Sequence, residues 1–332
     1  MLLAGDVGGT KTIMALFEAQ DKGWRCVKKT RYASLDYPTF TGLLQHFLAN
    51  CDIQTIGSAC FGVAGPIVDG DCVTTNLPWV LLRREIGKII GTTNVRLLND
   101  LEATAWGILD LPEADFVTLN PGGNNSPHTG NRAVLAAGTG LGEAIIAWNG
   151  ESNQVLASEG GHSDFAPGSK LEIALLQFLW EKYPCHVSYE RLLSGEGLVN
   201  IYLFLKKIGH APVEPEIERQ MSNYDPAAVI GEAGVAGTDV LSVAALSLFC
   251  RIYGAEAGNL ALKCLPYAGV YIAGGIAPKI LPLLTRGDFL EGYLEKGRYR
   301  AALKQIPVKV CINQEIGLLG ALAFAAQVFA GT

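Results

Sequence analysis

The stretch LLAGDVGGTKTIMALF, from Leu2 to Phe17, has an apolar strand, the turn Asp6–Lys11 and a second apolar strand. The same order returns in VLAAGTGLGEAIIAW, from Val134 to Trp148, around the turn Ala137–Gly142. A glycine turn between strands exposes backbone N–H groups, with no side chain to block an approaching anion. One such hairpin near the start of each half predicts two related domains that grip one polyphosphate. The pattern therefore indicates a nucleotide-dependent phosphotransferase built by duplication.

Composition narrows the class of protein. A chain of 332 residues predicts about two domains, and 49% hydrophobic with 17% charged residues is a globular balance. The net charge of -6 argues against a nucleic-acid partner, which would need a basic face. The eight cysteines form no Cys-x-x-Cys pair, so we expect buried free thiols in a reducing compartment and no zinc site.

The apolar stretches do not predict a membrane segment. Met1–Ala4 is short, lacks a basic region and runs directly into Gly5-Asp6, so it is expected to be a first strand and not a signal peptide. The most apolar stretch, Leu318–Ala330, is too short to span a bilayer. We therefore expect a cytoplasmic protein with no membrane partner.

Strands and helices alternate along the chain, which is typical of an α/β protein, and the two hairpins predict mixed sheets. The most loop-like segment is Pro121–His128, which places the domain boundary between about Leu109 and Asn131. The strands are expected at 13–17, 27–31, 56–63, 94–98, 269–273 and 308–312 besides the hairpins. The helices are expected at 39–48, 82–90, 101–109, 171–181, 197–207, 241–264 and 315–329.

The sequence lacks the two common phosphate-binding motifs, which leaves the paired hairpins as the candidate phosphate site. Neither a P-loop nor a Gly-x-Gly-x-x-Gly turn opening a helix is present. Either glycine turn alone would be an ordinary turn, but Asp6 and Thr10 in one and Thr139 in the other favour a phosphate clamp. A carboxylate beside such a turn would repel phosphate unless a cation intervened, so Asp6 is predicted to bind Mg²⁺ through water.

A third glycine site, Gly274-Gly275, follows the buried strand 269–273. A glycine pair at the carboxyl end of a strand lets the backbone lie against a flat ligand such as adenine. A plain strand-to-helix turn is an equally good interpretation of these two residues.

Asn99 and Asp100 stand between an apolar strand and a helix. Either residue could be a helix N-cap. Ligands of open α/β sheets bind at this edge, however, and an aspartate there can accept the proton of an attacking hydroxyl while Asn99 orients the substrate. We favour the functional interpretation.

The segment Glu159-Gly160-Gly161-His162 predicts a polyol site, because the glycines let a carboxylate and an imidazole face one cleft. A metal site at His162 is disfavoured, since no second histidine or cysteine lies nearby. Glu190 is expected in the first turn of a helix, where it would favour the helix dipole. The remaining histidines are expected to be surface or structural: His46, His128, His186 and His210.

Five motifs stand in this order along the chain: Asp6–Lys11, Leu98–Ala103, Ala137–Gly142, Ser158–Pro167 and Leu192–Gly195. With this combination the chain resembles the bacterial-type glucokinases of the actin/hexokinase-like ATPase superfamily. The resemblance extends from Ala4 to the closing helix. It implies two duplicated mixed-sheet domains of the actin/hexokinase-like (ribonuclease H-like) type with an interdomain cleft. The small domain would comprise residues 1–110 and 315–332, and the large domain residues 111–314.

The resemblance implies ATP-dependent phosphorylation of the 6-hydroxyl of glucose, the first step of glycolysis, with Mg²⁺. Asp100 would be the general base. Its implied sugar ligands are Asn99, Asp100, Glu159, His162 and Glu190, so the resemblance promotes Glu190 from helix starter to ligand. Its implied nucleotide-binding residues are Gly5, Asp6, Val7, Gly8, Gly9, Thr10, Gly138, Thr139, Gly140, Gly274 and Gly275. A homodimer is plausible from the family, and Lys11 is given no catalytic role.

Three alternatives stay open at this point. A related family of sugar kinases and repressors shares the opening motif, but its cysteine-rich zinc motif is missing here, and we expect no DNA-binding domain ahead of Ala4. A kinase of another hexose would fit the same polar residues. A sugar sensor or an actin-like assembly protein would bind ATP without sugar phosphorylation, although the presence of Asp100 argues against an inactive sensor.

Overall fold

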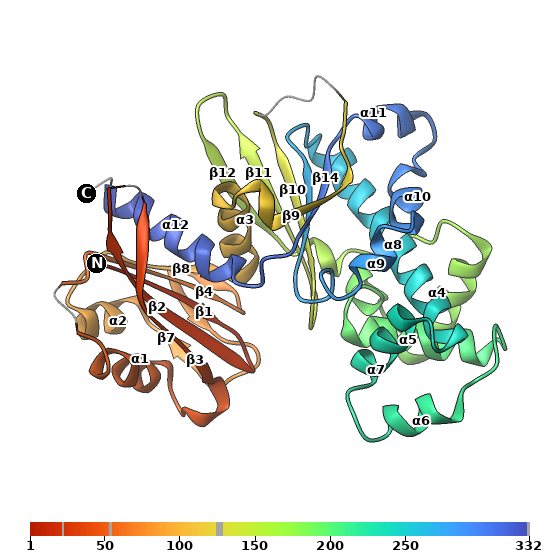
Figure 1. Cartoon of the computed structure of the whole chain (residues 1–332), viewed down its shortest axis with the longest axis horizontal. Coiled ribbons are helices and arrows are strands. Elements are labelled where there is room, and N and C mark those ends of the chain that lie inside the picture. Colours follow the sequence, from red (N-terminus) through yellow and green to blue (C-terminus); the bar gives the residue numbers. More distant parts are fainter. Residues whose placement is uncertain (22, 53–54, 124–128, 331–332) are drawn as a thin grey trace. The chain divides into compact units, whose positions relative to one another are not determined.

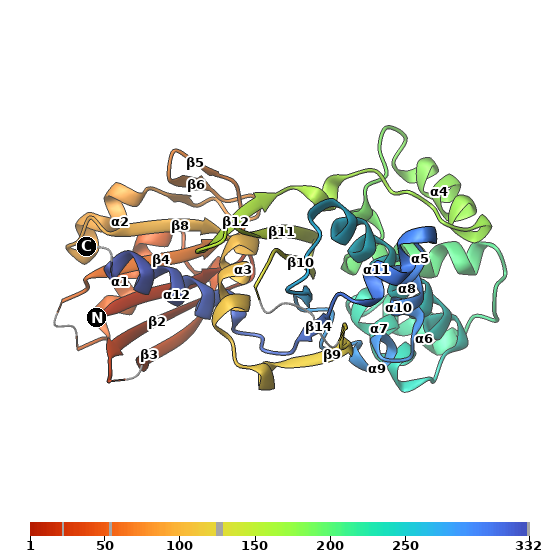
Figure 2. The same ribbon diagram turned by 90° about the horizontal axis from the view of Figure 1, so that it is seen from above.

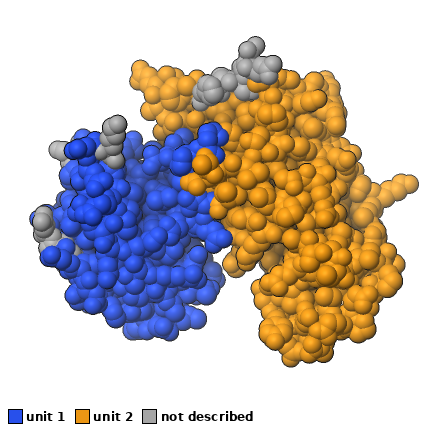
Figure 3. All heavy atoms as spheres, viewed as in Figure 1, with its two compact units in different colours: residues 1–113, 313–332 blue, residues 114–312 orange. Residues whose placement is uncertain are grey.

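The computed structural model describes residues 1–21, 23–52, 55–123 and 129–330. The later part of the predicted boundary loop, including His128, lies outside these residues, as do the last two residues of the predicted small domain. The chain divides into two compact units, shown in Figure 3. Unit 1 comprises Met1–Glu113 with Asn313–Thr332, and unit 2 comprises Ala114–Ile312.

Unit 1 is built on a five-stranded mixed sheet of order β3-β2-β1-β4-β8. β1 and β2 form the predicted antiparallel hairpin, whereas β4 and β8 run parallel to β1. The strands are β1 (Leu2–Val7), β2 (Lys11–Ala19), β3 (Trp24–Ala33), β4 (Ser58–Val63) and β8 (Val95–Asn99). A small second sheet contains β5 (Ile67–Val68), β6 (Asp71–Val73) and β7 (Val80–Leu81).

Helices cover both faces of the unit 1 sheet because β1 is apolar on both sides. Leu3 packs in one cluster with residues of α1 (Phe40–Ala49) and α2 (Arg83–Ile90). Leu2, on the other face, packs with residues of α3 (Asp100–Asp110) and α12 (Ile316–Ala330). Successive strand residues point to opposite faces, so a doubly apolar strand needs both helix layers. Figure 1 shows α12, from the end of the chain, lying along this sheet.

Unit 2 repeats the arrangement in a six-stranded sheet of order β12-β11-β10-β13-β14-β9. β10 pairs antiparallel with β11 and parallel with β13, as β1 does with β2 and β4. The strands are β9 (Phe116–Asn120), β10 (Arg132–Ala137), β11 (Leu141–Trp148), β12 (Asn153–Ser158), β13 (Val270–Ala273) and β14 (Val308–Cys311). The prediction of two related mixed sheets is confirmed.

The helices of unit 2 surround α8 (Val240–Cys264), and α10 (Asp288–Leu294) lies beside it in both Figure 1 and Figure 2. The other helices are α4 (Lys170–Lys182), α5 (Gly195–Lys207), α6 (Pro215–Met221), α7 (Pro226–Ala236), α9 (Leu281–Leu284) and α11 (Arg300–Lys304). By length and composition α8 could cross a membrane, but 67% of its most apolar window is buried inside the unit. It is placed as the core helix of a packed domain.

Two sequence expectations hold only in part. The helix expected at Glu190 is the single 3₁₀ turn Tyr189–Arg191, and α5 starts afterwards with Ser194 as its N-cap. The thiols are not all buried, because Cys26 and Cys185 are exposed. Cys26 lies on the edge strand β3, on which no residue is fully buried.

Candidate active site

The first hairpin turn is held from below by hydroxyl groups. Gly8 N donates to Lys11 O at 3.0 Å, which closes the turn. The buried Ser34 donates from Oγ to Gly8 O at 2.7 Å and lies 3.0 Å from Thr12 Oγ1. The N–H groups of Gly9 and Thr10 have no hydrogen-bond partner among the described residues. A rigid turn with unused donors is suited to an anion such as phosphate.

Asp6 stands at the carboxyl end of β1, just before this turn. Burial raises the pKa of its carboxyl, and Lys11 partly opposes that shift. Its Oδ1 faces the first turn of α12, since a Cβ built on Gly317 would lie 3.4 Å away. Gly5 and Val7 are interior instead: a Cβ on Gly5 would lie 2.6 Å from Phe61, and Val7 is buried.

Asn99 and Asp100 lie at the same edge of the unit 1 sheet as the first hairpin. Val7, Val63 and Asn99 are paired across the three parallel strands, so the strand ends coincide. Asn99 caps α3, accepting from Leu101 N through Oδ1 at 2.9 Å, as the N-cap interpretation expected. Asp100 Oδ1 accepts from the same N–H at 2.9 Å. Both side chains stay partly exposed at the sheet edge.

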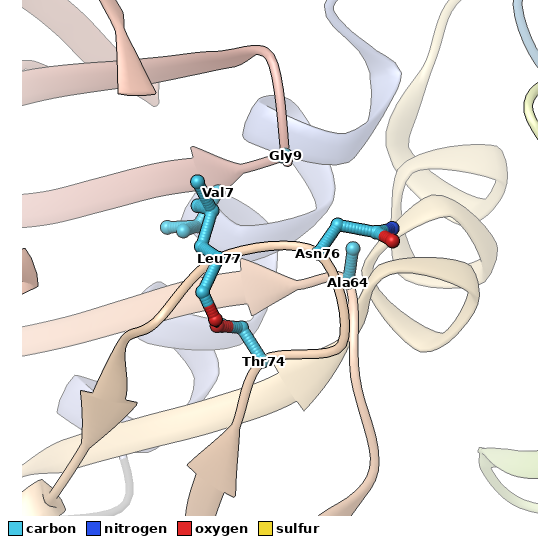
Figure 4. A pocket seen from close by; sticks show the side chains of 7 residues that line it. Val7, Gly9, Ala64, Thr74, Asn76 and Leu77 are labelled. Carbon is cyan, nitrogen blue, oxygen red and sulfur yellow. The ribbon is translucent and has the colours of Figure 1, made fainter. Parts of the chain in front are cut away.

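A narrow hollow adjoins the first hairpin, and Figure 4 shows the side chains that line it. Its lining residues are Val7, Gly8, Gly9, Ala64, Thr74, Asn76 and Leu77. Sequence reasoning passed over Thr74–Leu77. A Cβ on Gly9 would lie 3.0 Å from Asn76 Cβ, so this polar segment flanks the turn. The signal that could have found it is a polar run, Thr74-Thr75-Asn76, directly after a short strand.

The second hairpin turn is held by a carboxylate. Gly138 N donates to Gly140 O at 2.8 Å, and Leu141 N donates to Glu190 Oε2 at 3.0 Å. Gly195 N, at the start of α5, donates to Gly138 O at 3.0 Å. The N–H groups of Thr139 and Gly140 have no hydrogen-bond partner among the described residues. Like the first turn, this one presents two unused donors.

The predicted sugar ligands of unit 2 lie together. His162 Nε2 is 3.9 Å from Glu159 Oε2, and His162 Nδ1 is 4.0 Å from Glu190 Oε1. Glu159 and His162 keep 79% and 58% of their side-chain surface exposed, against 24% for Glu190. The three side chains form a polar group open to solvent. Each oxygen of Glu190 has its own neighbour, the second hairpin for Oε2 and His162 for Oε1.

Short backbone pairing joins the two chain segments that carry these ligands. Phe165 N donates to Val187 O at 2.9 Å, and Tyr189 N donates to Ser163 O at 3.0 Å. His186 reinforces the junction, with Nε2 2.8 Å from His162 O and Nδ1 2.9 Å from Asp164 Oδ1. This pairing is what brings Glu190 to His162 across the intervening helix α4.

The Gly274-Gly275 turn lies against the end of β10. Gly274 has φ of 83°, and a Cβ on it would collide with Ala137 O, so only glycine fits. Ile276 N donates to the same carbonyl at 3.2 Å. Gly275 is exposed, with nothing within 4 Å of a built Cβ. The turn thus presents bare backbone beside the second hairpin.

Metal binding by side chains alone finds no support in the described part of the chain. Among residues 1–21, 23–52, 55–123 and 129–330, no group of three or more His, Cys, Asp or Glu side chains is placed to hold an ion.

Comparison with known proteins shows the family of this chain. The glucokinase family profile matches residues 3–328. A curated glucokinase of Nostoc sp. is 43% identical over 98% of this chain and 99% of its own length. The crystal structure of a glucokinase from an Antarctic psychrotroph superposes with a TM-score of 0.85 at 29% identity, over 98% of both chains.

A more distant structure shares the fold. It is a ROK family glucokinase from Streptomyces griseus in complex with glucose and AMPPNP, with a TM-score of 0.66 and 23% identity over 98% of this chain and 99% of that one. The duplicated mixed sheets and the two glycine hairpins define a sugar kinase of the actin/hexokinase-like ATPase fold. Within that class, the chain belongs to the glucokinase family.

Proposed function

We propose that this protein is a hexose kinase that transfers the γ-phosphoryl group of ATP to the 6-hydroxyl of glucose. The main observation behind the proposal is that the side chains of Glu159, His162 and Glu190 lie close together beside the second glycine hairpin. Two carboxylates and an imidazole in fixed positions match the acceptor and donor needs of a polyol. The glucokinase relatives, one of them seen with glucose and AMPPNP, support the same substrates.

Asp100 is the proposed general base. It accepts the proton of the 6-hydroxyl as the oxygen attacks the γ-phosphorus, and the bond from that phosphorus to the bridging oxygen of ADP breaks. Asn99 orients the sugar through its amide. Phosphoryl transfer asks mainly for positioning and charge stabilisation, and one carboxylate at a sheet edge is enough to accept the proton.

The nucleotide is proposed to bind at the glycine turns. Gly8, Gly9 and Thr10 in unit 1 and Gly138, Thr139 and Gly140 in unit 2 offer N–H donors to the phosphates, while Gly274 and Gly275 face adenosine. Gly5 and Val7 contribute by packing the strand that carries Asp6. Asp6 is the residue that would hold Mg²⁺ through water, and the ion would neutralise phosphate charge when bound.

Three further features stand as proposals. The two compact units support a small domain of residues 1–110 with 315–332 and a large domain of residues 111–314. By the family resemblance, we propose that the domains close over the sugar. Closure would exclude water and suppress ATP hydrolysis. A cytoplasmic location and a homodimer are consistent with the family.

The test is sugar-dependent ADP release with Mg-ATP across glucose, mannose, fructose, glucosamine and N-acetylglucosamine, with sugar phosphate counted beside ADP. We expect a strong preference for glucose and equal amounts of the two products. Activity on another sugar alone would overturn the substrate while keeping the kinase. ATP hydrolysis without sugar phosphate would indicate a sensor or an assembly protein instead.

A further inference from the structure

Two glutamates that the proposed mechanism does not use are buried in unit 2. Glu143 on β11 is 1% exposed and Glu256 on α8 is 0% exposed. The two carboxyl groups lie within hydrogen-bonding reach of each other. The Oε1 atom of each has no hydrogen-bond partner among the described residues. Two ionised carboxylates would be strongly unfavourable here, because two negative charges would face each other without solvent.

A single shared proton resolves this conflict. If one carboxyl is protonated, its O–H can donate to the other carboxylate, and only one negative charge remains buried. The remaining negative charge has a cation nearby, because Lys263 Nζ lies 3.9 Å from Glu256 Oε1. Burial and the neighbouring carboxylate raise the pKa of Glu143 from 4.5 to about 8, and burial raises the pKa of Glu256.

The pair lies against both segments that carry the proposed sugar ligands. The Glu143 carboxyl fills the space beneath Gly160, since a Cβ built on Gly160 would collide with Oε2. Gly160 is the neighbour of Glu159. On the other side, the phenol of Tyr189 hydrogen-bonds with the Glu256 carboxyl, and Tyr189 is the neighbour of Glu190.

Hydrogen bonds of the Asn259 side-chain amide also connect Glu256 to Tyr189. Asn259 Nδ2 lies 2.8 Å from Glu256 Oε2 and 2.9 Å from the Tyr189 hydroxyl oxygen. Lys296 Nζ donates to Asn259 Oδ1 at 2.6 Å. The titratable groups that face the pair from the surrounding elements are Tyr189, Tyr253, Lys263, Cys264 and Lys296.

We propose that Glu143 and Glu256 share one proton and act together as positioning residues that hold the Glu159 and Glu190 segments in register for the sugar. The inference rests on the proposed function, because it assigns a role in glucose binding. Loss of the shared proton places two negative charges beneath the segments. Their repulsion separates Gly160 from Tyr189, and glucose binding weakens while the nucleotide turns of unit 1 are unaffected.

The test is the pH dependence of the glucose KM in wild type and in Glu143→Gln. A glutamine copies the neutral carboxyl, because its amide N–H donates to Glu256 at every pH. In wild type we expect the glucose KM to rise on the order of tenfold between pH 7 and pH 9, because an acid with a pKa near 8 is about one-tenth protonated at pH 9. In Glu143→Gln the profile should be flat over this range.

The matched control is Glu172→Gln, another buried glutamate of unit 2 that accepts from Gly168 N and lies at the start of α4. It should leave the wild-type rise in glucose KM in place. If Glu143→Gln does not fold, Glu256→Gln gives the same comparison with the roles exchanged. A Glu143→Gln enzyme that keeps the wild-type rise, or a wild type without one, would overturn the proposal.

A readout that needs no sugar separates this inference from the proposed function. Infrared spectra of the wild type should show a protonated carboxyl that is lost between pH 7 and pH 9. Between pH 4.5 and about 8 the folded chain holds a proton that the unfolded chain has already lost. The free energy of unfolding should therefore fall as pH rises through this range. That loss should be smaller in Glu143→Gln. A chain inactive on glucose would overturn the proposed function, and the absence of the carboxyl band would overturn the shared proton.

Discussion

The two glycine hairpins have the same strand pairing but different supports. The first, in unit 1, is held by the hydroxyls of Ser34 and Thr12 and is preceded by the acid Asp6. The second, in unit 2, has no acid in its turn and is held through Leu141 N by the carboxylate of Glu190. In the proposed function the first hairpin contacts only the nucleotide. The support of the second hairpin, Glu190, is also a proposed sugar ligand, so this hairpin would link the two substrates.

The largest effect is expected at the sheet edge of unit 1. Asp100→Asn should lower kcat by roughly 10²–10⁴, the usual scale of a lost general base, while glucose binding changes little. Steady-state kinetics with calorimetric glucose titration would measure both. Asp110→Asn, at the exposed far end of the same helix, is the matched control and should behave as wild type. Near-normal turnover in Asp100→Asn would reject its role.

The next effect tests the link in unit 2. A Cβ on Gly140 would collide with the Glu190 carboxylate, so Gly140→Ala should displace Glu190 from both its neighbours. We expect kcat/KM to fall roughly ten- to a hundredfold for glucose and for ATP together, as misplaced binding groups cost on this scale. Gly231→Ala on α7, where a Cβ meets nothing within 4 Å, is the control. A change in only one of the two substrates would contradict the link.

A smaller effect is expected at the acid that only the first hairpin has. Asp6→Asn should raise the Mg²⁺ concentration needed for half-maximal activity, because a charged oxygen ligand is lost. Because burial raises the pKa of Asp6, its ionised form costs folding free energy at neutral pH, and the variant should not melt earlier than wild type. A titration of activity with Mg²⁺ measures the metal requirement, and thermal unfolding at pH 7 measures the stability. An unchanged Mg²⁺ requirement would remove Asp6 from the metal site.

The smallest effect concerns the support of the first hairpin. Ser34→Ala removes the bond to Gly8 O and leaves the buried Thr12 hydroxyl without its neighbour, which should cost about 1–3 kcal/mol of stability. The KM for ATP should rise and the KM for glucose should not. Urea unfolding and two-substrate kinetics test this. An equal rise in both would mean that the hairpins do not differ as described.

Much of this arrangement was predictable from the sequence because its signals are local. Glycine positions and apolar runs are enough to predict both hairpins, the strand end at Asn99 and the paired glycines at 274–275. The N-cap role of Asn99 was also foreseen as an alternative.

What escaped prediction depends on contacts between distant segments. The polar run Thr74–Asn76 flanks the first hairpin only because a small sheet folds back on it. The single turn of Glu190 reaches His162 through backbone pairing across α4, and Glu143 meets Glu256 from an element more than a hundred residues away in sequence. Neither spacing nor periodicity encodes such meetings.

The link between sugar and nucleotide is tested most directly by titrating a nonhydrolysable ATP analogue, with and without saturating glucose, into wild type and Glu190→Gln. Binding free energies are reciprocal, so a real link must appear as a change in analogue affinity on adding glucose. The account predicts that glucose tightens the analogue in wild type and has no such effect in Glu190→Gln. Equal tightening in both proteins would contradict it.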